Sequence, residues 1–408
     1  MQNKTLSKNS TAIKSYLAVF ILLTWRQLSL IIINKSLDEI EVMHIELVLY
    51  ALFYISTILC SLFVSIFSEK TGKRLFMRLW TAIAIISSLV FIVFVAFNGR
   101  TLGSVIFSLF SGISVGMGIP ICFASFADYT RVENRGRIGA VLFFLTSLFF
   151  ALLISLSNIF SELAFSIFSI ILLTIILLFS RDWREINKSK VAFPSVIRSG
   201  PFLSYFSAWC IYCFIDAFEA PLLQHFLDVY FGEAFMRFIL SLMTLFASFS
   251  MFIAGFLADF RGRRNLLIYG FVMSGIAYVT VGIAAVHRVA WYLFSIVDGI
   301  AAGFFLVMFI FTIWGDLSLG RSNEKYYAIG TAPFFFINFI KELFIPYLEM
   351  IPVSASFSLA SFFLFLAVIP LLYAPETLPE KLIRRRELKK YVEKAKKIRE
   401  KYEKQKED

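Results

Sequence analysis

The stretch Gly255-Phe-Leu-Ala-Asp259-Phe-Arg-Gly262-Arg263-Arg264 decides the fold of this chain. It lies between two long apolar runs, so we expect a very short, strongly basic turn that joins two membrane helices. A weaker copy lies 190 residues earlier, as Ser65-Ile-Phe-Ser-Glu69-Lys-Thr-Gly72-Lys-Arg74. In each copy a small residue is followed by an acid at +4, Gly at +7 and two cations at +8 and +9. Two copies at half-chain spacing indicate a duplicated membrane bundle.

These ten residues resemble the signature loop of the major facilitator superfamily, which occurs between helices two and three and again between helices eight and nine. The second copy fits well, whereas the first departs at Ser65, in place of Gly, and at Glu69, in place of Asp. The resemblance implies an all-α membrane protein with twelve transmembrane helices in two pseudo-symmetric six-helix bundles. It also implies a secondary transporter of prokaryotic type, in which helices one, four, seven and ten line a central cavity.

The composition agrees with a membrane-embedded chain. Of its 408 residues, 59% are hydrophobic and 16% are charged, whereas a soluble domain carries about 25% charged residues. The net charge of +11 does not indicate nucleic-acid binding, because the cations gather in the tail after Pro379 and in short loops. The first apolar run, from about Tyr16, is too long for a cleaved signal segment.

Twelve apolar runs reach the length of about 20 residues that a spanning helix needs. Six are predicted in an N-terminal bundle (1–180) and six in a C-terminal bundle (201–374), with a cytoplasmic linker (181–200) between them and a charged cytoplasmic tail (375–408). The predicted helices are 15–34, 46–67, 76–97, 102–126, 138–160, 163–180, 201–222, 235–258, 265–286, 289–314, 328–349 and 353–373.

Loop charge predicts the orientation. One set of alternate loops holds most of the cations, including those at 70–78, 131–137 and 261–264, whereas the other set holds only Lys35, Arg100, Arg237 and Arg288. By the positive-inside rule both termini of this multi-pass chain are cytoplasmic, in the cell membrane. Helices four and ten also echo each other, since paired glycines precede Asp128 and Asp316 in the same way.

Charges inside spanning helices are candidates for function, because each costs about 2.5–3.5 kcal/mol near the bilayer centre. Helices one and seven align as repeats, which places Gln27 opposite Asp216, so we predict that Arg26 and Asp216 face each other across the cavity. An aromatic and acidic stripe runs along helix seven, and Asn338 shares a face of helix eleven with Lys341. The predicted substrate or proton pathway is Arg26, Gln27, Trp209, Tyr212, Asp216, Glu219, Asp298, Asn338 and Lys341. In the alternative, these charges only neutralise one another and hold the halves together.

The two basic turns predict a conformational gate. A carboxylate is attracted to the positive end of a helix dipole, so Asp259 or Glu69 is expected to bind a helix N-terminus in the other half, or a cation such as Arg135 or Arg321. The contact would hold the cytoplasmic side shut. The gate residues are Ser65, Glu69, Gly72, Arg74, Gly255, Asp259, Gly262, Arg263 and Arg264. A further role of the cations is to set the topology.

The function predicted from these features is secondary transport of a small solute by alternating access, coupled to protons, by a monomer in the lipid bilayer. The four cysteines lie in apolar runs, and His44, His225 and His287 are expected in loops without a partner cluster, so no metal and no cofactor is expected. No phosphate-binding glycine loop occurs in the linker or tail. Direct use of ATP is therefore not expected. The chain is not expected to be an enzyme, because the sequence places no cluster of His, Cys or metal-binding acids at one depth near a headgroup region. A membrane-embedded enzyme, such as a lipid transferase, and a non-transporting receptor on the same fold are the alternatives.

The sequence Ala374-Pro-Glu-Thr-Leu-Pro379 resembles a Pro-Glu-Thr signature that ends the sixth or twelfth helix in several branches of the superfamily. The tail that follows it alternates charges with good helix formers. We expect a solvated or membrane-surface helix there, with partner binding as the alternative.

Overall fold

The computed structural model describes residues 2–40, 45–179, 188–348, 351–378 and the single positions 388, 392 and 395. These residues form helices and turns, without a strand among them. Ten helical segments in this part of the chain are long and apolar enough to cross a membrane. The shorter apolar helix α6 and the 25-residue helix α13, which carries Lys341 and Glu342, complete the predicted twelve.

The N-terminal half consists of α1 to α6, whose bounds are Gln2–Leu37, Ile45–Thr71, Lys73–Ala96, Arg100–Tyr129, Arg135–Ser157 and Glu162–Phe179, with the short helix η1 at Val132–Asn134. A short helix, α7 (Phe193–Ile197), lies in the predicted linker. The C-terminal half begins with α8 (Gly200–Phe231), α9 (Glu233–Arg261) and α10 (Arg263–Ala284). Its tenth span is α11 (Arg288–Leu306) continued by the π-turn η3 (Val307–Thr312) and α12 (Ile313–Leu317). The last spans are α13 (Glu324–Leu348) and α14 (Val353–Leu366) with α15 (Val368–Tyr373).

The two signature turns have the same backbone conformation. Gly72 alone separates α2 from α3, with φ 91° and ψ 149°, and Gly262 alone separates α9 from α10, with φ 95° and ψ 154°. These angles lie in a region that residues with a Cβ rarely adopt, so each link requires glycine. The turn predicted from sequence is therefore a single residue long and is built twice.

Glycines at repeat positions allow close helix contacts in both halves. A Cβ on Gly116 of α4 would lie 2.9 Å from Cα of Thr57 on α2, and a Cβ on Gly303 of α11 would lie 2.8 Å from the backbone nitrogen of Met251 on α9. The backbones therefore approach more closely than larger residues would allow. The same packing occurs in both repeats.

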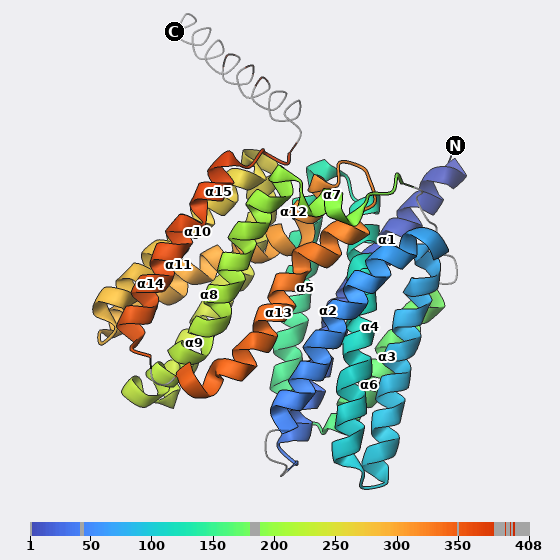
Figure 1. The fold of residues 1–408 in the computed structure, drawn as a ribbon, viewed down its shortest axis with the longest axis horizontal. Helices are drawn as coiled ribbons and strands as arrows, with labels where there is room; N and C mark the ends of the chain where they lie inside the picture. Colours follow the sequence, from blue (N-terminus) through green and yellow to red (C-terminus); the bar gives the residue numbers. More distant parts are fainter. Residues whose placement is uncertain are drawn as a thin grey trace, which may run out of the picture.

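The halves meet along two pairs of helices. On one side, α13 of the C-terminal half packs against α2 of the N-terminal half, so that α13 lies between α8 and α2 (Figure 1). On another side, α5 of the N-terminal half packs against α9 of the C-terminal half. The start of α1 and the end of α15 lie at the same end of the molecule, with α7 and α12 (Figure 1). The signature turns belong to this end too, which we call the basic end; the other we call the opposite end.

One of the three histidines differs from the prediction. His225 lies inside α8 and not in a loop, because α8 continues to Phe231, nine residues beyond the predicted end of that helix. His287 immediately precedes α11, as expected of a loop residue. The prediction for His44, and that for the tail apart from the three single positions, lie outside the described residues.

Candidate functional site

Asp259 joins the two halves at the basic end. Its side chain is fully buried, and its Oδ2 accepts a hydrogen bond of 3.1 Å from the backbone N–H of Arg137, in the first turn of α5. The residue before α5, Asn134, makes no side-chain capping bond, so a carboxylate from the other half satisfies this helix N-terminus. A Cβ on Gly136 would lie 2.8 Å from Asp259 Oδ1. The contact is therefore possible only because residue 136 is glycine.

A buried carboxylate and two arginines strengthen this contact. Asp316, at the end of α12, forms ion pairs with Arg135 of the N-terminal half and Arg263 of the C-terminal half. Arg263 is fully buried and also donates a 2.5 Å hydrogen bond to the carbonyl of Val132. Arg135 donates to the carbonyl of Ala127 at 2.7 Å. Removing the carboxylate would leave two buried cations without it, which typically costs about 3–5 kcal/mol per broken pair.

The other signature copy forms a second contact related to the first by the repeat. Glu69 forms an ion pair of 2.6 Å with Lys325, at the start of α13. In the same way, Asp259 binds the start of α5. Lys73 pairs with Glu324 at 2.5 Å and with Asp128 at 2.7 Å. Asp128 also accepts a 2.6 Å hydrogen bond from Asn323 and pairs with Lys188 of the linker. We call the contacts around Asp259 and Asp316 the first gate, and those around Glu69 and Asp128 the second gate.

The signature after the last helix also contacts the first gate. Glu376 accepts hydrogen bonds from the backbone N–H groups of Arg263 (2.9 Å) and Arg264 (3.1 Å), in the first turn of α10. Gly262 has no side chain to cap this helix, so the Glu376 carboxylate does so. Thr377 donates to Asp316 at 3.3 Å. The segment after α15 is therefore bound to the same carboxylate that joins the halves.

The remaining predicted gate residues have different surroundings. Ser65 is buried and donates to the carbonyl of Leu62, within its own helix. Gly255 faces Ala140 and Gly136 of α5, where a Cβ would overlap them. The guanidinium of Arg264 binds the carbonyl of Ala374 at 3.2 Å, within the C-terminal half. Arg74 is exposed, and its neighbour Lys73 makes the ion pairs of the second gate.

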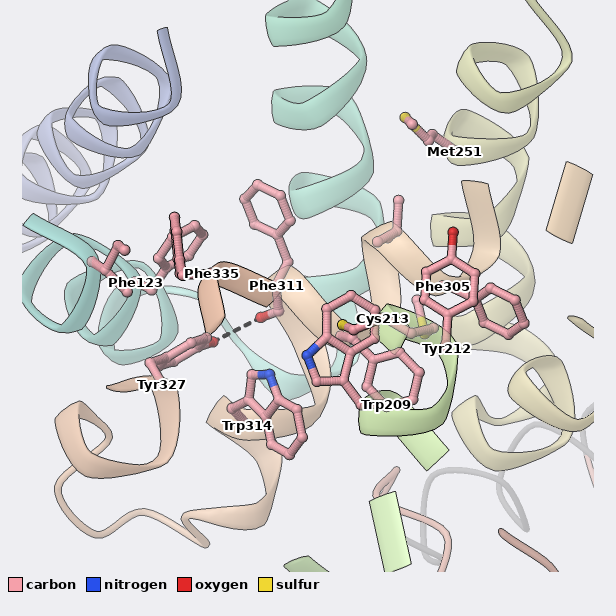
Figure 2. Close-up of a cluster of buried hydrophobic side chains, with 14 of the residues drawn as sticks. Phe123, Trp209, Tyr212, Cys213, Met251, Phe305, Phe311, Trp314, Tyr327 and Phe335 are labelled. Atoms are coloured by element: carbon pink, nitrogen blue, oxygen red, sulfur yellow. Dashed lines mark hydrogen bonds between the residues drawn. The ribbon is translucent and has the colours of Figure 1, made fainter. Parts of the chain in front are cut away.

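An aromatic cluster lies next to these polar contacts, towards the middle of the molecule. Phe311 of η3 makes edge-on contacts with Phe123 and Phe126 of α4 and with Phe143 of α5, at centroid distances of 5.4 to 5.7 Å. Tyr327 stacks on Phe123 at 5.5 Å and donates a 2.7 Å hydrogen bond to the carbonyl of Phe311 (Figure 2). At the basic end the two halves are therefore joined by an apolar layer and by these polar contacts.

A cavity of about 100 Å³ lies between the halves on the other side of the aromatic cluster. Its lining comes from α1, α4, α5, α11, η3 and α13. Eleven of the sixteen lining residues are Leu, Val, Ile or Phe, so the space is mainly apolar. Its polar residues are Arg26, Gln27, Thr146, Ser147 and Thr331.

Of the predicted pathway residues, only Arg26 and Gln27 line this cavity. The seventh spanning helix, α8, does not contribute to it, contrary to what the family resemblance implied. Phe334 and Phe335 of α13 line it instead, since α13 lies between α8 and α2 (Figure 1). Residues Leu306 and Ile310 reach it from the tenth span.

The predicted contact between Arg26 and Asp216 is wrong in this conformation. No ion pair joins the two side chains, although the structure describes both. Arg26 instead stacks on α13, with its guanidinium carbon 4.9 Å from the ring centre of Phe334. Asp216 accepts a 3.5 Å hydrogen bond from Tyr212 on its own helix. The repeat alignment gave matching positions on α1 and α8, but it did not reveal that the aromatic face of α13 meets Arg26.

The other predicted pathway residues lie inside the C-terminal half. Asp298 is buried and accepts a 2.5 Å hydrogen bond from Ser274 of α10, and Glu219 accepts one of 2.5 Å from Ser356 of α14. Tyr212 lies between Trp209 and Phe305, at ring distances of 5.6 and 4.5 Å (Figure 2). Within the described residues, Asp216, Glu219 and Asp298 form no ion pair within 4.0 Å.

The two predicted pathway residues on α13, Asn338 and Lys341, make polar contacts with other residues of the same helix. Lys341 pairs with its neighbour Glu342 at 3.0 Å. The side-chain amide of Asn338 donates to the carbonyl of Phe334, one turn earlier, at 2.7 Å. Both residues therefore make their polar contacts within their own helix.

No family model and no curated protein matches this sequence. Solved structures match its fold. The human organic anion transporter MFSD10 has a TM-score of 0.66 at 15% identity, over 89% of this chain and 99% of that one. The proton:xylose symporter XylE has 0.64 at 14% identity, over 91% and 96%. FucP, in an outward conformation, has 0.69 at 10% identity, over 90% and 98%.

Proposed function

Because the chain has the fold of the major facilitator superfamily transporters, we propose that it is a secondary transporter that moves a small solute across the cell membrane by alternating access. The observation that carries the proposal is the pair of gates at the basic end. Asp259 binds the start of α5, and Glu69 binds the start of α13, so each half holds the other through the same element of its repeat. A rigid-body rotation of one half would break both contacts together.

The positive-inside rule makes the basic end cytoplasmic in this proposal. The described conformation is then the one closed to the cytoplasm. The ion pairs that the structure describes between the two halves all lie at this end, and among the described residues no ion pair joins the halves at the opposite end. A solute would enter the central cavity from outside, and the gates would open to release it inside.

Coupling to protons is proposed through the carboxylates of the C-terminal half. An ionised carboxylate that is buried without a cation is costly, so such a group takes up a proton or gains water. Asp298 is 4% exposed and has Ser274 as its hydrogen-bond partner. We assign it the coupling role, with a proton bound in the described conformation and released when water reaches it. Asp216 and Glu219, on the neighbouring α8, are the next candidates.

Transport by purified protein in proteoliposomes tests this function. The vesicles would contain a fluorescent pH indicator, and the external panel would be xylose, alanine, benzoate and tetraphenylphosphonium. We expect one solute class to move protons into vesicles with wild-type protein and not into empty vesicles. In Asp298→Asn, proton-driven accumulation should be lost while solute exchange continues. Arg237→Gln, an exposed substitution at the opposite end, is the matched control.

Two results would contradict parts of the proposal. Binding of a solute without any flux or exchange would indicate a receptor on this fold. Accumulation in Asp298→Asn that collapses with a protonophore as in wild type would place the coupling group elsewhere.

A further inference from the structure

Arg26 is a cation without a counter-charge in an apolar cavity. It forms no ion pair within 4.0 Å in the described part of the chain, and no acidic residue lines the cavity. Its buried Nε makes no hydrogen bond. The rings of Phe334 and Phe335 lie 4.9 and 5.6 Å from its guanidinium carbon, and such contacts are much weaker than a buried ion pair. A partly buried cation in this setting calls for an anion.

The other polar groups of the cavity supply few hydrogen-bond donors. Thr146 and Thr331 donate their hydroxyl protons to backbone carbonyls one turn earlier, at 2.8 and 2.7 Å, and Ser147 does the same at 2.9 Å. Gln27 makes no side-chain hydrogen bond to the residues that the structure describes. The free donors among the lining side chains are therefore the guanidinium of Arg26 and the amide of Gln27, two neighbouring residues of α1.

We propose that the transported solute is a small organic monoanion, a carboxylate with a compact apolar body. This rests on the proposed transport function and adds the substrate class to it. The carboxylate would bind Arg26, whose planar guanidinium matches it through two parallel hydrogen bonds. The body would lie against Phe334, Phe335 and Phe150 (Phe335 is shown in Figure 2).

The cavity disfavours other classes. It holds one cation, so a dianion would keep one uncompensated charge. An organic cation would be repelled by Arg26, since no carboxylate lines the space. A sugar presents many hydroxyls, which an apolar lining with few free donors leaves unpaired. The volume, about 100 Å³, is of the same order as that of cavities that hold benzene, at about 150 Å³, so the apolar body is at most about one ring in size.

Three probes that share one ring test this class: benzoate, benzamide and benzylamine. Binding to wild-type protein in nanodiscs would be measured by calorimetry, with empty nanodiscs as the blank. We expect benzoate to bind about tenfold or more tightly than benzamide, and benzylamine not to bind, because a charge-assisted pair is worth at least one factor of ten. This comparison requires no variant.

Variants then locate the anion. Arg26→Gln should weaken benzoate binding about tenfold or more and leave benzamide unchanged, and Arg26→Lys should retain part of the preference. Arg237→Gln, the same change at an exposed site, should bind as wild type does. Equal affinity for the three probes, or wild-type benzoate binding by Arg26→Gln, would overturn the proposal.

Uptake assays distinguish a failure of the proposed substrate class from a failure of the proposed transport function. If proteoliposomes take up xylose, alanine or tetraphenylphosphonium and benzoate does not bind, the substrate class is wrong and the transport function stands. If benzoate binds through Arg26 and does not cross the membrane, the anion site stands and the transport function is wrong.

Discussion

The carboxylate of Asp259 accepts a hydrogen bond from the backbone N–H of Arg137, 3.1 Å away across the boundary between the two halves. The bond caps α5, whose own preceding residue, Asn134, makes no capping bond. The charge of the carboxylate favours the closed gate, because the helix N-terminus attracts it only while the halves touch.

The substitution Asp259→Asn should therefore open the basic end more often. A helix-terminus charge is worth about 0.3–2 kcal/mol, so the open fraction should rise by up to about 30-fold. Ser322 is 5% exposed, and a cysteine placed there should react with a thiol reagent faster in this variant. Glu233→Gln, which removes an exposed acid from the other end of α9, is the control. An unchanged labelling rate in Asp259→Asn would contradict the role of the charge.

The second gate predicts energetic coupling between Glu69 and Lys325. Both side chains are about nine-tenths buried and lie 2.6 Å apart, so single substitutions to Gln leave one charge unpaired. A double-mutant cycle on thermal stability should give a coupling of roughly 0.5–3 kcal/mol. The exposed pair Arg237 and Glu233 provides the matched cycle, for which we expect at most about 0.5 kcal/mol. Equal coupling in the two cycles would show that the second gate is not a buried ion pair.

The Glu376 cap predicts that the segment after the last helix stabilises the first gate. Glu376→Gln removes the charge from the N-terminus of α10, at a cost of about 0.5–2 kcal/mol. We expect a melting temperature lower by roughly 1–4 °C and faster labelling of a cysteine at Ser322. If Glu376→Gln lowers stability without changing the labelling, the cap serves α10 alone and has no effect on the gate.

The orientation is tested by cysteines at exposed ends of the molecule. Leu319, at the basic end, is 83% exposed, and Asn98, in the turn between α3 and α4, is exposed at the opposite end. In intact cells a membrane-impermeant reagent should label Asn98→Cys from outside, and Leu319→Cys only after permeabilisation. The reverse pattern would invert the assigned topology. Ser322, used above to report opening, is unsuitable for this test because it is buried.

The sequence alone predicted the twelve helices and their boundaries to within a few residues in most cases, because long apolar runs and basic turns are local signals. It also predicted the acidic residue of each signature as the contacting group, although the functional role of these residues is still a prediction. The sequence predicted the kind of partner, a helix N-terminus or a cation, but did not identify α5 or Lys325 as the partners. Lys325 lies 256 residues from Glu69, and no local pattern reports which half-to-half contacts the packing allows.

The pathway residues were harder to place for a physical reason. A stripe on α8 shows that Trp209, Tyr212 and Asp216 share a face, but not which helix covers that face. In the structure α13 lies between α8 and the cavity. In the tenth span, the π-turn η3 rotates the side chains that follow it relative to a regular helix, and a pattern of 3.6 residues per turn does not predict this. Lys73, Asp128, Asp316 and Glu376 were missing from the predicted gate, although all but Glu376 lie in charged turns or repeat positions that point to them. Arg135, predicted as a possible partner of a signature acid, pairs with Asp316 instead.

The central claim is that the two gates open together while the opposite end closes. The most direct measurement is a pair of spin-label distances in nanodiscs: one across the basic end between Lys70 and Leu319, and one across the opposite end between Asn98 and Ile283, all exposed positions. Distances would be recorded in wild type and in a variant with Asp259→Asn and Glu69→Gln. The account predicts that the variant gains a longer distance at the basic end and a shorter one at the opposite end, in matching proportions. Unchanged distances at both ends, or a change at one end alone, would contradict it.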